Sequence, residues 1–373
     1  MTHSIQRRQL LATGAAAVAS TLLPFGLAQA QEQQRRFAPQ LGPWRSFEVT
    51  TTITVADVKG ATQLWLPVPN LANDYQRSGT TRWTGNATSA KVATDPVSGV
   101  TMLHAQFGAD VFEPTLSVTS ALQTRNRVTD WSRTGSFSED AAVLKKALSP
   151  TELLPLDGIV HKTAAEATRG AKTDLDKVRG VYDWVVANAH REPKTRGCGT
   201  GDIKTMLETG HLSGKCADLN ALFVGLCRAA GVPARDVYGL RLAPSAFPYK
   251  ELGGNPASLK GAQHCRAEVF LASHGWVAMD PADVLKVMRQ ETPEWIKDRN
   301  HPVAAPVVAG LFGNWEGNWV GWNTGHDVTL PGSAAKGTLP FLMYPNGENA
   351  SGRFDELSPD NFRYTIAAKE LTI

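Results

Sequence analysis

The segment from Gly214 to Gly231 constrains the fold most, because it predicts a buried helix with a cysteine at its start. Its apolar residues recur at helical spacing and form one stripe, made of Leu219, Leu222, Phe223, Leu226 and Ala230. Gly231 suits the left-handed position that ends a helix, and Pro233 prevents the helix from continuing. Cys216 is therefore expected in the first turn of a helix that packs against the core.

The position of Cys216 favours a reactive thiol. A cysteine attacks as its thiolate, and both the free amides of a helix start and a nearby imidazolium stabilise that anion. Gly214 allows a tight turn of the backbone just before the cysteine and leaves room for a substrate. A lone cysteine is more often a small buried core residue, so the interpretation of Cys216 as a nucleophile depends on partners elsewhere in the chain.

Those partners lie on a predicted hairpin. Residues 263–271 alternate in character as a strand does, 273–275 have turn chemistry, and 276–281 form the return strand. His264 and Asp280 are 280 − 264 = 16 residues apart on opposite arms near the open end, and this even spacing allows both to project from one face. The imidazole can take the thiol proton while the carboxylate fixes its tautomer, so a Cys216, His264, Asp280 triad is predicted.

Together these segments resemble the transglutaminase-like (transglutaminase-core) superfamily of papain-like cysteine enzymes. The resemblance rests on Gly214-Lys215-Cys216, on the turn from Ala229 to Arg235, on His264, and on the Gly275 to Pro281 segment. It covers roughly residues 140–290. It implies a papain-like core, in which a helix bearing the cysteine packs on an antiparallel sheet bearing the histidine and aspartate.

Strand periodicity dominates the chain before this core. Alternation of apolar and polar residues predicts short strands at 47–55, 64–69, 90–93, 100–107 and 116–122. Residues 45–130 are therefore expected to form an all-β sandwich-type domain, which makes the fold class α+β. Helical spacing predicts helices at 139–147 and 173–189 and a turn at 203–208, and with the hairpin these place the transglutaminase-like core at residues 138–290.

Residues 291–373 form a C-terminal extension rich in tryptophan. Its tryptophans are Trp295, Trp315, Trp319 and Trp322, and they alternate with turn residues. Flat apolar rings could line a substrate lid, but the favoured interpretation is that they anchor a loop-rich extension to the core.

The first thirty residues are predicted to direct export. Arg7 and Arg8 precede an apolar stretch, and residues 28–30 (Ala-Gln-Ala) suit a signal peptidase, so residues 1–30 are interpreted as a twin-arginine signal peptide rather than a retained membrane anchor. Its removal leaves a leader at 31–44 and a net charge of +3 − 2 = +1. We expect a periplasmic protein with no membrane span after cleavage and no nucleic-acid partner.

Several polar residues near the predicted triad have alternative roles. Cys265 is either packed in the core or paired in a disulfide with Cys198, and packing is slightly favoured. Asp218 is expected to stabilise the helix start, and Arg235 to form a structural ion pair. Arg266 is expected to place a cation on the His264 face.

The developing oxyanion needs donors, of which the Cys216 backbone amide is the first. A second donor would come from residues 196–215 or from Trp184, although Trp184 fits the helix core better.

The expected chemistry is attack on a peptide or protein amide through a thioacyl intermediate. Water as the acceptor gives a peptidase or amidase, and an amine gives a protein-glutamine transferase that cross-links; hydrolysis is favoured because no amine site is recognisable. No cofactor or calcium site is evident in the sequence. The alternative from another class is a non-catalytic binding or assembly module that retains the fold.

Overall fold

A computed structural model describes residues 35–56, 58–358 and 362–372. The predicted signal peptide and residues 31–34 of the predicted leader lie outside the described residues. Within the described part of the chain, none of the helices is long and apolar enough to cross a membrane.

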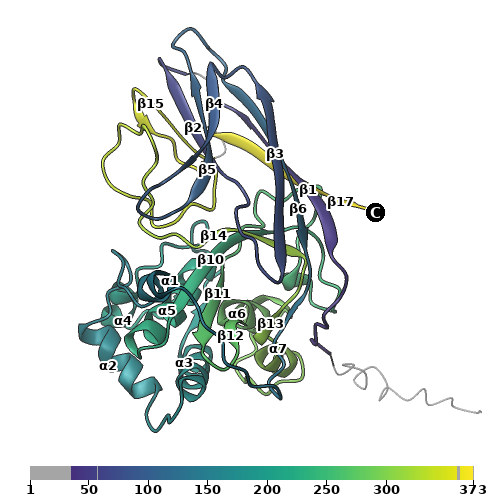
Figure 1. The fold of residues 1–373 in the computed structure, drawn as a ribbon, viewed down its shortest axis with the longest axis vertical. Helices are drawn as coiled ribbons and strands as arrows, with labels where there is room; N and C mark the ends of the chain where they lie inside the picture. The colour runs from purple at the N-terminus through teal and green to yellow at the C-terminus, as the bar shows by residue number, and fades with distance from the viewer. Residues whose placement is uncertain (1–34, 57, 359–361, 373) are drawn as a thin grey trace, which may run out of the picture. The chain divides into compact units, whose positions relative to one another are not determined.

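The N-terminal strands form two antiparallel sheets. One sheet has the order β17 (Arg363–Leu371), β1 (Arg45–Thr54), β6 (Thr115–Thr124), β3 (Gln76–Gly85). The other has the order β16 (Gly352–Arg353), β15 (Asn346–Asn349), β2 (Thr62–Pro67), β5 (Thr101–Phe107), β4 (Ser89–Thr94). Figure 1 shows the two layers separately, with β2, β4, β5 and β15 in one and β1, β3, β6 and β17 in the other.

Alternation along the strands explains this packing. In β6, buried and less buried residues alternate along the whole strand, so one face joins the core. The predicted strands are all present. The additional strand β3 is almost entirely exposed and polar, which is why apolar periodicity did not reveal it.

A third antiparallel sheet belongs to the core that carries the predicted triad. Its order is β14 (Trp319–Asn323), β10 (Ala234–Arg241), β11 (Arg266–Leu271), β12 (Gly275–Met279), β13 (Phe312–Trp315), β7 (Arg127–Val128). The β11–β12 pair is the predicted hairpin, with Ala267 opposite Met279. Two further strands, β8 (His190–Arg191) and β9 (Ser213–Gly214), pair in parallel.

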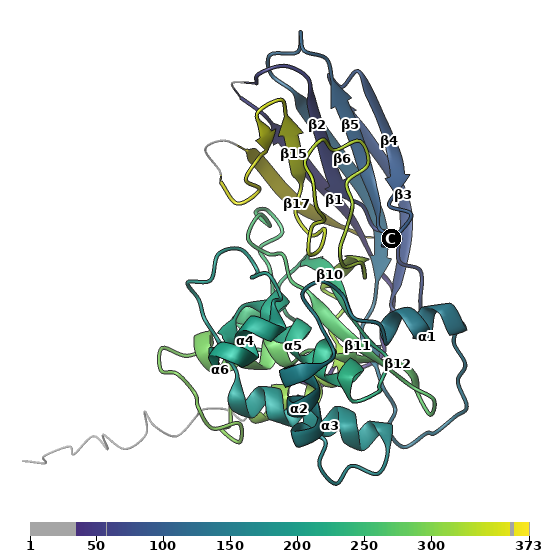
Figure 2. The same cartoon turned by 90° about the vertical axis from the view of Figure 1, so that its left-hand side faces the viewer.

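Helices cover this sheet. They are α1 (Ala141–Ala147), α2 (Gly158–Ala167), α3 (Asp174–Asn188), α4 (Ile203–Thr209), α5 (Cys216–Ala229), α6 (Pro281–Gln290) and α7 (Ala305–Gly310), with a 3₁₀ turn at Lys250–Leu252. Helix α5 packs on β10 and β11 and is flanked by α2, α3 and α6, as Figure 2 shows from the side of these helices. The α+β fold with a cysteine-bearing helix on an antiparallel sheet is therefore the fold of this chain.

Local signals placed most of the helix ends. Helix α5 starts at Cys216, and Gly231 follows it with a φ of 81°, which confirms the left-handed ending. Helix α3 has the predicted capping box between Thr173 and Asp176. Helix α2 was not predicted; its N-cap residue, Asp157, makes no side-chain capping bond, so the local signal is weak.

Strands from the C-terminal part of the chain complete both N-terminal sheets and the core sheet. Strands β15, β16 and β17 belong to the two N-terminal sheets, and β13 and β14 belong to the core sheet. Trp315, Trp319 and Trp322 are buried, which confirms that they anchor this part of the chain, whereas Trp295 is exposed.

Candidate active site

Cys216 lies at the start of α5, next to the loop that carries Cys198. Cys216 is 2% exposed and is the first residue of the helix, so its own amide is not used by the helix ladder. Asp218 accepts hydrogen bonds from the amides of Thr200 (2.9 Å), Gly201 (3.0 Å) and Lys215 (3.0 Å). This confirms that Asp218 stabilises the helix start, and shows that it also fastens the preceding loop to it.

Two glycines are required where this loop meets the helix. A Cβ at Gly199, where φ is 89°, would lie 1.8 Å from Asp218 Oδ2, and one at Gly214 would lie 2.2 Å from the same atom. Real Cβ atoms do not approach so closely, so the backbone reaches the helix start only because no side chain is present. The loop carries Cys198, whose carbonyl accepts from the Ala217 amide at 3.0 Å.

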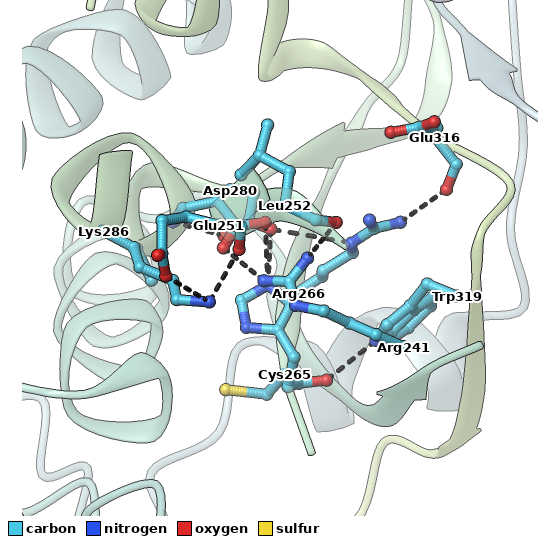
Figure 3. Close-up of polar contacts among 12 residues, drawn as sticks. Arg241, Glu251, Leu252, Cys265, Arg266, Asp280, Lys286, Glu316 and Trp319 are labelled. Carbon is cyan, nitrogen blue, oxygen red and sulfur yellow. Dashed lines mark hydrogen bonds and ion pairs between the residues drawn. The ribbon is translucent and has the colours of Figure 1, made fainter. Parts of the chain in front are cut away.

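Backbone contacts fix His264 on both sides. Its amide donates to the Gly239 carbonyl (3.0 Å), and the Trp319 indole donates to the His264 carbonyl (2.8 Å). Figure 3 shows the Trp319 ring directed at this backbone beside Cys265. The strand was predicted over residues 263–271, but β11 begins at Arg266, where pairing with Val237 of β10 starts; pairing with β12 starts one residue later, at Ala267 and Met279.

Asp280 meets His264 at the open end of the hairpin. His264 Nε2 lies 2.8 Å from Asp280 Oδ2, so the carboxylate holds the N–H of this nitrogen and leaves Nδ1 for the thiol. Asp280 is also the N-cap of α6, since its Oδ1 accepts from the Asp283 amide at 3.0 Å. The structure therefore brings the predicted His264 and Asp280 together, with Asp280 fixed by a helix cap rather than by a strand.

A second carboxylate and two guanidinium groups surround this pair. Asp283 Oδ2 lies 3.3 Å from His264 Nε2, and Asp283 Oδ1 accepts from Arg241 at 2.5 Å. Arg266 Nε lies 3.6 Å from Asp280 Oδ2, which confirms a cation near the site. Figure 3 shows Arg266 extending from this cluster towards Glu316, whose carbonyl accepts from it at 3.0 Å.

The charges shift the pKa values of His264 and Cys216 in opposite directions. Burial and Arg241 lower the pKa of His264, but Asp283 and Asp280 outweigh them and raise it to about 9. The neighbouring Cys198 and Cys265 thiols, together with His264, hold the pKa of Cys216 well below its usual range despite burial. The arrangement therefore favours a thiolate beside an imidazolium.

All four cysteines are free and buried. Cys198 and Cys265 contact Cys216 as thiols, which agrees with packing rather than with a disulfide between them. The Tyr344 hydroxyl contacts Cys198 from the C-terminal part of the chain. Contact with Cys216 and burial raise the pKa of Cys198 well above its usual range, so Cys198 stays protonated, and its Sγ donates to the Gln263 carbonyl at 3.4 Å.

Asn220 is a site residue that the sequence interpretation missed. One helical turn after Cys216, its Nδ2 donates to the Cys265 carbonyl (2.9 Å) and to Asp280 Oδ1 (3.3 Å), and its Oδ1 accepts from the Ala282 amide. Asn220 thus ties the cysteine helix to the aspartate. A buried amide four residues after Cys216 in an otherwise apolar helix was the available signal.

The remaining predicted residues have structural roles. Arg235 Nε donates to Glu268 Oε2 at 2.6 Å, which confirms a structural ion pair. Trp184 is half-buried against the core and does not line the cavity above Cys216, which supports its assignment to the helix core.

His264, Asp280 and Asp283 offer three potential metal-ligand atoms within 4.8 Å of one another. Arg241 already contacts Asp283 and offsets the negative charge of these carboxylates. We therefore assign Asp280 and Asp283 to balancing the positive charge of His264 rather than to binding a metal.

Comparisons with known proteins agree with this geometry. The model of the transglutaminase-like superfamily matches residues 161–281, which include Cys216, His264 and Asp280. An uncharacterized protein of Haemophilus influenzae is 33% identical over 343 residues, covering 87% of this chain and 91% of that protein. The uncharacterized protein YebA of Bacillus subtilis is 28% identical over 146 residues, 37% of this chain and 19% of that protein.

A solved structure has a similar fold. The protein is from Cytophaga hutchinsonii and is provisionally named a cysteine protease; it superposes with a TM-score of 0.51 and 16% sequence identity. The match covers 90% of this chain and 93% of the other.

Proposed function

Because the chain belongs to the transglutaminase-like superfamily and has a cysteine-enzyme fold, we propose that it cleaves an amide through a thioacyl intermediate, with water as the acceptor. One observation carries the proposal. Cys216, at the start of a buried helix, contacts His264, whose far nitrogen is held by Asp280 at 2.8 Å. This arrangement of thiol, imidazole and carboxylate is that of an activated nucleophile.

The charges define the order of proton transfers. With Cys216 a thiolate and His264 an imidazolium, the sulfur attacks the amide carbonyl without first losing a proton. The C–N bond then breaks, and His264 gives its proton to the leaving amine. Water next attacks the thioester, gives a proton to His264, and the C–S bond breaks to release the acid and restore the thiolate. The Cys216 amide is the first donor to the oxyanion in both steps.

The surroundings of the thiol support water over a lysine amine as the acceptor. The cavity of about 370 Å³ beside Cys216 is lined by the cationic side chains of Arg191, Lys215, Arg241 and Lys286. An approaching lysine ammonium would be repelled by Arg191 and Lys215, which have no carboxylate partner among the described residues, whereas water is not. Amine transfer is therefore the second choice.

We also propose that the enzyme works in the periplasm after twin-arginine export. The support is the sequence of residues 1–30, in which Arg7 and Arg8 precede the apolar stretch. The Arg7→Lys/Arg8→Lys double variant should remain in the cytoplasm when cells are fractionated. Undiminished periplasmic protein in that variant would contradict this route.

Alkylation of the thiol tests the catalytic proposal. Iodoacetamide should label Cys216 faster than a free thiol at pH 6 to 7, as followed by mass spectrometry of the intact protein and its peptides. In His264→Ala this acceleration should be lost, whereas the exposed His161 provides a matched control, His161→Ala, with unchanged labelling. Labelling at the free-thiol rate, without dependence on His264, would instead favour a binding module.

The acceptor needs a separate experiment. Candidate peptides are incubated with the enzyme, with and without a primary amine, and the masses of the products are measured by mass spectrometry. We expect two fragments whose summed mass exceeds that of the intact peptide by one water. Cross-linked product alone would overturn the preference for hydrolysis.

A further inference from the structure

The cavity beside Cys216 has an unusual balance of charge. Four cationic side chains from separate segments line it: Arg191 from β8, Lys215 before α5, Arg241 from β10 and Lys286 from α6. No aspartate or glutamate is among the described residues that line it. A ligand in this cavity therefore meets positive charge on several sides.

Two of the four cations already have carboxylate partners. Arg241 contacts Asp283 at 2.5 Å, and Lys286 lies 3.3 Å from Glu251, a pair that Figure 3 shows. These two cations are therefore largely compensated within the protein.

Arg191 and Lys215 are not compensated in this way. Arg191 donates to the neutral amide oxygen of Gln290 at 3.0 Å, and neither Arg191 nor Lys215 forms an ion pair with any residue that the structure describes. The parallel pairing of Arg191 with Gly214 sets Arg191 beside Lys215. Burial and then Arg191 lower the pKa of Lys215, as expected for two like charges held close together, and Cys198, Cys216 and Glu192 oppose this shift only in part. An anion between them would relieve this repulsion.

A buried donor also lacks an acceptor. Gln263 lines the cavity and is 8% exposed, and its Nε2 has no hydrogen-bond partner among the described residues. Buried amide groups are nearly always hydrogen-bonded, so an acceptor from a ligand is expected. Gln263 precedes His264, which places this donor close to the reacting atoms.

We propose that the substrate carries a carboxylate close to the amide that is cleaved, and that Lys215 and Arg191 bind this carboxylate while Gln263 donates a hydrogen bond to the substrate. The proposal rests on the proposed function, because it takes Cys216 as the nucleophile. It assigns the substrate to acidic peptides, in which the carboxylate belongs either to a side chain or to the C-terminus.

Two reagents of similar size and different charge test this proposal. Iodoacetate is an anion and iodoacetamide is neutral, so the ratio of their rates at Cys216 reports the charge preference independently of the thiolate fraction. We expect this ratio to exceed that of a free thiol, and to fall about fivefold in Lys215→Met and in Arg191→Met. Lys336→Met removes one exposed cation that does not line the cavity, and should leave the ratio unchanged.

The wild-type protein offers a second measurement that needs no variant. Added salt should lower the iodoacetate rate more than the iodoacetamide rate, because it screens the charge of only one reagent. Fast alkylation with an unchanged ratio in both variants would overturn the carboxylate site and leave the nucleophile standing. Slow alkylation that does not depend on His264 would overturn the nucleophile itself.

Protection from iodoacetamide identifies the source of the carboxylate. N-acetyl-Ala-Glu-amide carries it on a side chain, N-acetyl-Ala-Gln carries it at the C-terminus, and N-acetyl-Ala-Gln-amide has none. Stronger protection of Cys216 by one acidic peptide than by the neutral one supports the proposal and names the source. Equal behaviour of all three peptides overturns it.

Discussion

His264 faces two buried carboxylates, and these differ in what else they hold. Burial and the neighbouring Asp283 raise the pKa of Asp280. Although burial opposes it, Arg241 and then His264 hold the pKa of Asp283 well below its usual range. Asp283 is thus the lasting negative charge beside the imidazolium, while Asp280, at 2.8 Å and with the better hydrogen bond, sets the orientation of the ring.

Replacement of Asp280 should separate these roles. In Asp280→Asn the amide nitrogen cannot accept the Nε2–H of His264, so the ring loses its orientation and part of the support for its positive form. We expect the alkylation of Cys216 at pH 6 to slow by roughly 10- to 100-fold. Asp298→Asn, an exposed substitution of the same kind, controls for the loss of charge and should change nothing. Equal rates in the two variants would contradict a role for Asp280.

The pH dependence follows from the pKa values of the pair. The thiolate is present above the lowered pKa of Cys216, and the imidazolium is present below the His264 pKa of about 9. Peptide cleavage should therefore be flat through neutral pH and fall as the pH rises through about 9, because the leaving amine then receives no proton. Initial rates of peptide cleavage, measured in a stopped assay from pH 5 to 10, check this pH dependence. A rise in activity through pH 6.5, the ordinary value for histidine, would show that neutral His264 is the active form.

At the scale of single elements, the first turn of α5 depends on one side chain. Asp218 accepts three backbone hydrogen bonds, from Lys215, Thr200 and Gly201, and so joins the helix start to the loop that carries Cys198. The loop in turn keeps the Cys198 thiol against Cys216. The reactivity of Cys216 and the stability of the helix start are therefore coupled.

Asp218→Ala should reveal this coupling. It leaves one buried and two partly buried amides without their acceptor, and we expect the free energy of unfolding to fall by about 3 kcal/mol, measured by urea denaturation. Asp174→Ala, in the exposed first turn of α3, is the matched control and should cost less than about 1 kcal/mol. Cys216 in Asp218→Ala should also react more slowly at pH 6, since the loop no longer holds the Cys198 thiol firmly beside Cys216. Unchanged stability would show that the loop is held by other contacts.

At the scale of the whole described chain, the last strand supports both a sheet and the cavity. Strand β17 pairs with β1 from Arg363 to Leu371. Its Ile366 carbonyl accepts from the Leu259 amide, and its Ala368 amide donates to the Pro256 carbonyl, each at 2.8 Å. Leu259 and Pro256 belong to the loop that contributes residues to the cavity wall.

Ile366→Ala tests this link. Ile366 is buried, so the lost packing should lower the free energy of unfolding by about 3 kcal/mol. Thr365→Ala on the exposed face of the same strand is the control and should change it by less than about 1 kcal/mol. Hydrogen exchange at the Leu259 amide should accelerate in Ile366→Ala alone. Exchange unaffected by the substitution would mean that the loop holds itself in place.

The sequence alone predicted the cysteine helix and singled out Cys216, His264 and Asp280 as candidate site residues. Helical periodicity, capping boxes and turn residues act within a few positions, so a local sequence pattern specifies where a helix begins and ends. The hairpin was equally local, although its strand begins two residues after His264 because pairing, rather than alternation, sets a strand end.

Only the tertiary structure decided which other groups surround the reactive pair. Asn220, Asp283, Arg241 and Tyr344 reach the site from four separate segments, and no spacing in the chain relates one of these segments to another. The same holds for the edge of the first sheet, where Arg45 and Glu370 pair across 325 residues. Such contacts depend on how whole elements pack, and burial then decides which charges must be compensated and which, like Arg191 and Lys215, are left for a ligand.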